Sequence, residues 1–186
     1  MRRKDRQMNA DFGKQVIDKA KYGVVSMIDE YNNPHGLPLS IVRDGDSLYF
    51  HSAKEGKKID NFKNNSKVSI AFVGDVNIPE NYTKEELDEI VKDESKAALL
   101  ISSVFTTEYE SAIVKGEVKS VEDMQEKIKA MRLVCEKYTP DKIKYFDMAI
   151  KAGLSRTNVY KVEIEEITAK RKKYDGTGKE MKWGRM

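Results

Sequence analysis

Apolar and polar residues alternate in several short segments of the chain, and this pattern predicts about six β-strands. The clearest segment is 67–73, where every second residue is apolar. Further strands, dense in β-branched and aromatic residues, are expected at 22–28, 37–42, 47–52, 107–118 and 157–168. The dipeptide Asp44-Gly45 precedes the third of these segments and predicts a tight hairpin. Most neighbouring strands are therefore expected to be antiparallel.

A second spacing, with apolar residues three or four positions apart, predicts helices between the strands. It is clearest over 121–138, which carries an apolar stripe on one face. Other helices are expected at 11–21, 56–65, 83–92 and 141–151. Asp11 is the expected N-cap of the first helix, and Thr83 with Glu86 has the spacing of a capping box. The apolar run 97–104 fits either a buried helix end or a strand.

These elements together indicate an α+β, mainly β, protein rather than the strict strand–helix alternation of a doubly wound fold. One antiparallel sheet that curls on itself is the economical way to hide its edges. Pro38 must lie at a strand start or on an edge strand, and Gly116 is expected to kink its strand. The 186 residues suit a single domain, with a helical insertion at 81–103 and a basic, solvated tail at 170–186.

Composition narrows the classes of function. The formal net charge is only +3, because 34 basic residues nearly balance 31 acidic ones, so a nucleic-acid partner is not expected. No apolar run reaches the roughly 20 residues that span a bilayer, and the basic start is not followed by an apolar segment. A soluble, unsecreted protein without a membrane partner is therefore expected. The single cysteine, Cys135, agrees with a cytoplasmic location and is expected to be a buried core thiol.

Common catalytic and cofactor motifs are missing from the sequence. It contains no GxGxxG, Walker A, HExxH or GxSxG spacing. The two histidines, His35 and His51, lie in different segments, so no metal site is expected. What remains is the junction 52–58, which joins a strand end to a helix start and holds Ser52, Lys57 and Lys58. Free backbone N–H groups at a helix start favour an anion, so this junction is a candidate phosphate site, although solvated lysines at an ordinary junction explain it too.

The order of several motifs resembles that of a known family. YGVVSMI, GLPLSIV, DGDSLYFHSA, EGKKIDN, KVSIAFVGD and FTTEYESAIVKG follow one another along the chain. As a set they resemble the pyridoxamine 5′-phosphate oxidase-like flavoproteins, and among these the nitroimidazole-resistance (Nim) group. The resemblance covers nearly the whole chain. It implies a six-stranded antiparallel split β-barrel with peripheral helices, which forms a homodimer with one FMN per subunit at the interface.

The resemblance also assigns roles to residues. Ser52, Lys57 and Lys58 would meet the FMN phosphate, with Lys58 the more direct contact, and Ala53 would be a further cofactor-binding residue. His51 would lie beside the flavin and would be the catalytic residue. Pro38, Leu39 and Ser40 would line the ring, largely through backbone groups. Tyr109 and Arg156 would make contacts from the other subunit or serve structural roles in the barrel.

Three functions follow from the resemblance. The first is an FMN-dependent oxidoreductase, in which an external donor such as NAD(P)H reduces the flavin and a small aromatic or nitro compound is then reduced. The second is a non-catalytic binder of flavin or haem. The third is pyridoxamine phosphate oxidation, for which the arginine-rich substrate contacts have no counterpart in this chain. The insertion 81–103, which could lie over the cofactor or enlarge a dimer contact, leaves the substrate open.

Overall fold

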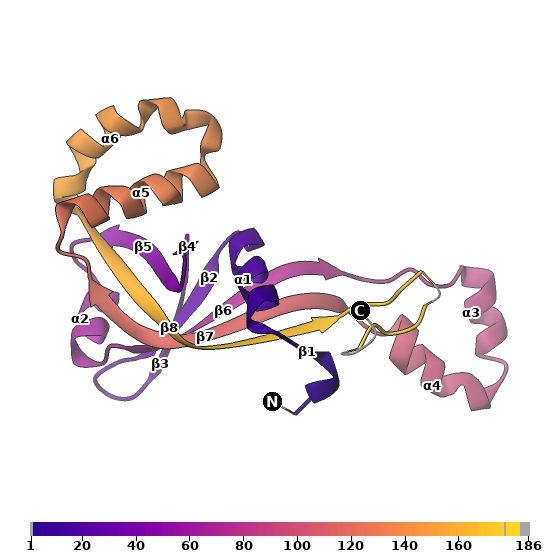
Figure 1. Ribbon diagram of the computed structural model, residues 1–186. Helices are drawn as coiled ribbons and strands as arrows, with labels where there is room; N and C mark the ends of the chain where they lie inside the picture. The colour runs from indigo at the N-terminus through magenta and orange to yellow at the C-terminus, as the bar shows by residue number, and fades with distance from the viewer. Residues whose placement is uncertain (1, 177, 183–186) are drawn as a thin grey trace.

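The computed structural model describes residues 2–176 and 178–182, which form one long antiparallel sheet flanked by helices (Figure 1). The strand order is β3-β2-β6-β7-β8-β5-β4, and β1 adds to β8. The strands are β1 (Gln7–Met8), β2 (Gly23–Ile28), β3 (Pro34–Leu39), β4 (Val42–Asp44), β5 (Ser47–Ala53), β6 (Lys67–Asn77), β7 (Glu108–Ser120) and β8 (Thr157–Lys172). The sheet curls without closing, as in a split barrel.

Helices lie in three places around the sheet. The helices are α1 (Ala10–Lys19), α2 (Lys57–Asn64), α3 (Lys84–Ile90), α4 (Ala97–Leu99), α5 (Met124–Tyr138) and α6 (Phe146–Gly153). A 3₁₀ segment, Pro140–Tyr145, joins α5 to α6. In Figure 1, α2, α5 and α6 lie at one end of the sheet, α1 lies near its middle, and α3 and α4 lie at the far end. No helix within the described ranges is long and apolar enough to cross a membrane.

Two hydrophobic clusters hold these layers together. The first fills the curled sheet, where Val16 and Ile17 of α1 meet strand residues such as Phe72, all of them buried. The second lies on the other face of β5, where Tyr49 packs under α5 with Val134 and Val159. Because side chains alternate along a strand, β5 thus serves a different cluster with each of its faces.

Five of the six predicted strands are present near their predicted bounds, but the predicted strand 37–42 is interrupted at residues 40 and 41, so that its two parts belong to β3 and β4. The structure has two strands more than predicted. β1 and β4 are only two and three residues long, too short to show a periodic signal. Asp44 and Gly45 form the predicted hairpin, with Gly45 at φ 60°. Pro38 lies in β3 at the edge of the sheet, as expected for a residue without a backbone donor. The register shift between Lys115 and Gly116 confirms the predicted irregularity.

Some expectations were wrong. Asn9, not Asp11, caps α1, because its side chain accepts a hydrogen bond from the Phe12 N–H at 2.8 Å. The tail begins later than predicted, since β8 continues to Lys172 and Lys170 pairs with β1. Arg185, which belongs to the predicted tail, lies outside the described residues. Cys135 is half-buried rather than fully buried. The ambiguous run 97–104 is helical.

Candidate functional site

The junction between β5 and α2 has the backbone geometry of an anion site. Gly56 precedes the helix with φ 126° and ψ 158°, a conformation that side chains other than glycine rarely adopt. No described side chain caps α2, so its first N–H groups are free of a side-chain partner. Lys57 and Lys58 are the first two residues of this helix. Positive charge and unpaired donors therefore coincide at one helix start.

His51 and Ser52 occupy opposite faces of β5. Ser52 is buried on the inner face, and its hydroxyl donates to the carbonyl oxygen of Ala53 at 2.7 Å. His51 is exposed in the single chain and follows the face on which Tyr49 packs under α5. The two side chains that the sequence groups together thus point apart. Ser52 would have to change its hydrogen bond to bind the ligand of its neighbour.

His51 and Lys58 lie close enough to influence one another. Partial desolvation lowers the pKa of His51 below its ordinary value of 6.5, and the positive charge of Lys58 lowers it further. The imidazole is therefore neutral at pH 7, with one nitrogen donating and the other accepting. This electrostatic coupling brings the end of β5 and the start of α2 into one site.

We expect His51 to titrate below pH 6.5 and its pKa to rise in a Lys58→Ala variant. Because the pKa of His51 is lower in the folded state, the unfolded chain binds more protons below pH 6.5. The contribution of His51 to the free energy of unfolding therefore decreases as the pH falls through this range. NMR titration of the imidazole signals checks both statements, with a His51→Gln variant to assign the resonance. A His51 pKa that does not respond to loss of Lys58 would contradict the coupling.

The link between β3 and β4 brings Pro38, Leu39 and Ser40 to the same end of the molecule. Val42 pairs with Tyr49, so the same antiparallel register extended by two residues would place Ser40 opposite His51.

Two side chains at the end of α5 hold this link. The Tyr138 hydroxyl accepts from the Ile41 N–H and donates to the Ile41 carbonyl oxygen, each at 2.9 Å. Lys137 Nζ donates to the same carbonyl at 2.9 Å and to that of Ile17 at 3.0 Å. The sequence assigned Tyr138 only to an apolar stripe, and helical spacing carries no signal for this second role.

Arg156 joins this group, and Tyr109 does not. Arg156 precedes Thr157, which pairs with Ala53 at the end of β5. Tyr109 pairs with Lys172 of β8, whereas His51 pairs with Val159. Thirteen residues of β8 separate these two positions, which is roughly 40 Å of strand at 3.3 Å per residue. Arg156 is thus at the His51 end of its own chain, and one small ligand cannot touch both His51 and Tyr109 of the same chain.

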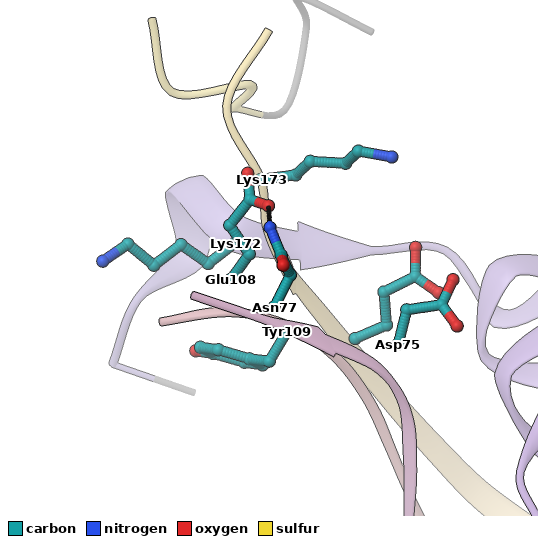
Figure 2. A pocket seen from close by; sticks show the side chains of 7 residues that line it. Asp75, Asn77, Glu108, Tyr109, Lys172 and Lys173 are labelled. Atoms are coloured by element: carbon teal, nitrogen blue, oxygen red, sulfur yellow. Dashed lines mark hydrogen bonds between the residues drawn. The ribbon is translucent and has the colours of Figure 1, made fainter. Parts of the chain in front are cut away.

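Tyr109 lines a separate hollow of about 250 Å³ at the far end of the sheet (Figure 2). Burial opposes ionisation of Glu108 there, but hydrogen bonds from Asn77 at 3.0 Å and from the Tyr174 N–H outweigh it and lower the pKa of Glu108. The other residues that line the hollow are Asp75, Glu110, Lys172 and Lys173. The structure therefore places the predicted site residues in two groups at opposite ends of the sheet.

Comparison with known proteins places this arrangement in context. A family model described as pyridoxamine 5′-phosphate oxidase matches residues 14–171. No curated protein sequence matches the chain.

Among solved structures, a candidate 5-nitroimidazole antibiotic resistance protein from Bacteroides thetaiotaomicron is 25% identical, with a TM-score of 0.66 over 89% of this chain and 86% of that chain. An FAD and heme binding protein from Mycobacterium smegmatis has a TM-score of 0.66 at 14% identity, over 89% and 73% of the two chains. An FAD binding protein from the same organism has a TM-score of 0.55 at 15% identity, over 89% and 96%. The last two similarities concern the fold alone.

Proposed function

Because the chain belongs to the pyridoxamine 5′-phosphate oxidase family, we propose that it binds flavin mononucleotide at the junction of β5 and α2 and uses it for redox chemistry. The observation that carries the proposal is the uncapped, lysine-bearing start of α2, whose Lys58 acts electrostatically on His51. A flavin phosphate at the helix start would place the ring system within reach of the His51 edge. Two flavin-binding proteins of similar fold support the choice of cofactor class.

The residues present fit a monophosphate. Two lysine ammonium groups and the free N–H groups of α2 offer several donors to one dianion. Lys58 is the more direct contact in this proposal, since its charge already acts on His51. Ser52 contributes less, because its hydroxyl is buried and bonded to Ala53. A single phosphate site of this kind suits FMN better than FAD, because the pyrophosphate of FAD carries a second phosphate.

A second copy of the chain would complete the site. Tyr109 lies at the far end of the sheet from His51, so it can meet the flavin only in trans. The outer face of the sheet offers an apolar surface for such a contact. There the half-buried Val24 pairs with the half-buried Ala71, and Ala71 pairs with Ile113, which is exposed, as is Val73. We therefore propose a homodimer with the flavin between the two barrels, which this placement supports.

Bound flavin supplies electron transfer, and the chain supplies orientation and proton control. Neutral His51 can donate a hydrogen bond to a polar atom of the ring or of a substrate and can accept a proton there. The bonds from Tyr138 and Lys137 to Ile41 fix the β3–β4 link whose backbone would line the ring. We propose reduction of a small aromatic or nitro compound, with an external reductant such as NAD(P)H. The similarity to the Bacteroides protein supports this substrate class.

The visible absorption spectrum of the purified protein tests the proposal. We expect a yellow protein with flavin bands, and mass analysis of the released cofactor should identify FMN rather than FAD. Protein purified without cofactor should take up FMN in a fluorescence titration. A colourless protein that takes up no FMN at micromolar concentration would contradict the proposal, and a haem spectrum would identify the non-flavin alternative.

A further inference from the structure

Residues 78–107, called here the helical arm, stand at the end of the long β6–β7 pair (Figure 1). The arm contains α3 and α4, and it is an ordered element. Thr83 and Glu86 form the predicted capping box, with bonds of 3.2 and 2.8 Å. Asn81 donates to the Ser103 carbonyl at 3.4 Å, and the Tyr174 hydroxyl donates to the Ser102 carbonyl. The arm is thus tied together and to the segment after β8.

The surface of the arm is apolar and acidic. Ile101 and Phe105 are 73% and 78% exposed, although a single chain has no reason to leave such side chains in water. An open hollow of about 410 Å³ lies on α3 beside Tyr82 and Ile90. Glu85, Glu86 and Glu89 also line it. The arm as a whole carries seven acidic residues against three basic ones. An open hollow lined by apolar and acidic side chains suits a surface that presents lysine stems beside large apolar side chains.

A surface of this kind lies at the other end of the sheet. The segment Pro140–Tyr145 and α6 expose Tyr145 and Met148, the latter by 80%. Residues 140–156 carry four basic residues against two acidic ones, and residues 54–58 at the flavin site carry three against one. In one chain, α6 and the arm lie at opposite ends of the sheet (Figure 1). The complementary surfaces can therefore meet only between two copies.

We propose that the helical arm of one protomer packs against the Pro140–Tyr145 and α6 surface of a second copy, next to the flavin site of that copy. The inference rests on the proposed flavin-binding homodimer. It adds that residues of the helical arm of one protomer lie beside the flavin site of the other. Two-fold symmetry makes the contact occur twice, once at each site. The hollow on α3 receives basic side chains, and Ile101 and Phe105 cover the apolar surface around them. The arm then forms one wall of the substrate entrance.

Cross-linking between two tagged forms of the full chain tests this placement. Both forms carry Cys135→Ser, which removes the single native thiol. One form adds Glu89→Cys on the arm, and the other adds Met148→Cys on α6. After subunit exchange, a short bis-maleimide should join the two forms into a covalent heterodimer. The matched control replaces Glu89→Cys by Lys67→Cys at the start of β6, an exposed position away from the arm, and should give little heterodimer.

A charge-reversal cycle gives an independent readout. In the form that carries Glu89→Cys, reversing the exposed Glu85 and Asp88 to lysine leaves the Thr83–Glu86 capping box intact and should lower the heterodimer yield about tenfold. Reversing Lys142, Lys144 and Lys151 to glutamate in the other form should restore it. Absence of the Glu89–Met148 cross-link in a dimeric protein overturns the arm placement. Flavin loading is read separately from the spectrum. Cross-linked protein that binds no flavin leaves the arm contact standing and contradicts the proposed function, whereas loaded protein without the cross-link contradicts only the arm contact.

Discussion

Replacement of Lys58 by alanine is expected to weaken FMN binding about 10- to 100-fold, the loss typical of one charge-assisted hydrogen bond to a phosphate. Lys58 stands at the second position of α2, next to the free N–H groups of the helix start. Its charge already acts on His51, so its ammonium lies near the edge at which the flavin would bind. A fluorescence titration of cofactor-free protein with FMN measures the change. The same titration with riboflavin should show little effect, because riboflavin has no phosphate.

Lys63 provides the matched control for this experiment. It lies in the same helix and carries the same charge, but it belongs to the last turn and is exposed. Lys63→Ala therefore changes the net charge equally while leaving the helix start intact, and FMN affinity should fall by less than about twofold. Equal losses in the two variants would mean that general charge, rather than a phosphate contact at Lys58, governs binding.

Much of the fold could be predicted because its signals are local. Alternation in 67–73 and 157–168 predicted β6 and much of β8, and the spacing of Thr83 and Glu86 predicted the start of α3. The β4–β5 hairpin followed from Asp44-Gly45 alone, since few residues tolerate that turn. These features depend on residues that are neighbours in sequence. The boundaries that failed, such as the end of β8, depend on pairing with distant strands.

The candidate site was predictable only in part for the same reason. The β5–α2 junction is contiguous, so the residues alone brought Ser52, Lys57 and Lys58 together as a candidate anion site, whereas His51 was added by the family resemblance. His51 and Ser52 are neighbours in the motif, but side chains alternate between the two faces of a strand, so these two point apart. The separation of Tyr109 from His51 required the register of β7 and β5 on β8, which no local pattern contains. The same register underlies our proposal that Tyr109 would meet the flavin from a second copy.

The pairing of β7 with β8 fixes the distance between Tyr109 and the His51 end of the sheet, and it includes one position where only glycine fits. A Cβ atom at position 116 would lie 2.1 Å from the carbonyl oxygen of Glu163 and 2.9 Å from Cγ1 of Val162. The first contact is with backbone, which cannot rotate away as a flexible side chain can. The register shift between Lys115 and Gly116 lies at the same point.

Gly116→Ala is accordingly expected to lower the free energy of unfolding by about 2–3 kcal/mol, because β7 and β8 must separate locally to admit the methyl group. For a chain of this size the melting temperature should fall by roughly 5–10 °C, measured by circular dichroism on cofactor-free protein. Gly36→Ala is the matched control, since it is the same change in β3 and its Cβ would meet nothing closer than 3.6 Å. That variant should melt within a degree or two of wild type, about 0.5 kcal/mol or less. If both variants melted alike, the close approach of β7 to β8 at Gly116 would not be a constraint on the fold.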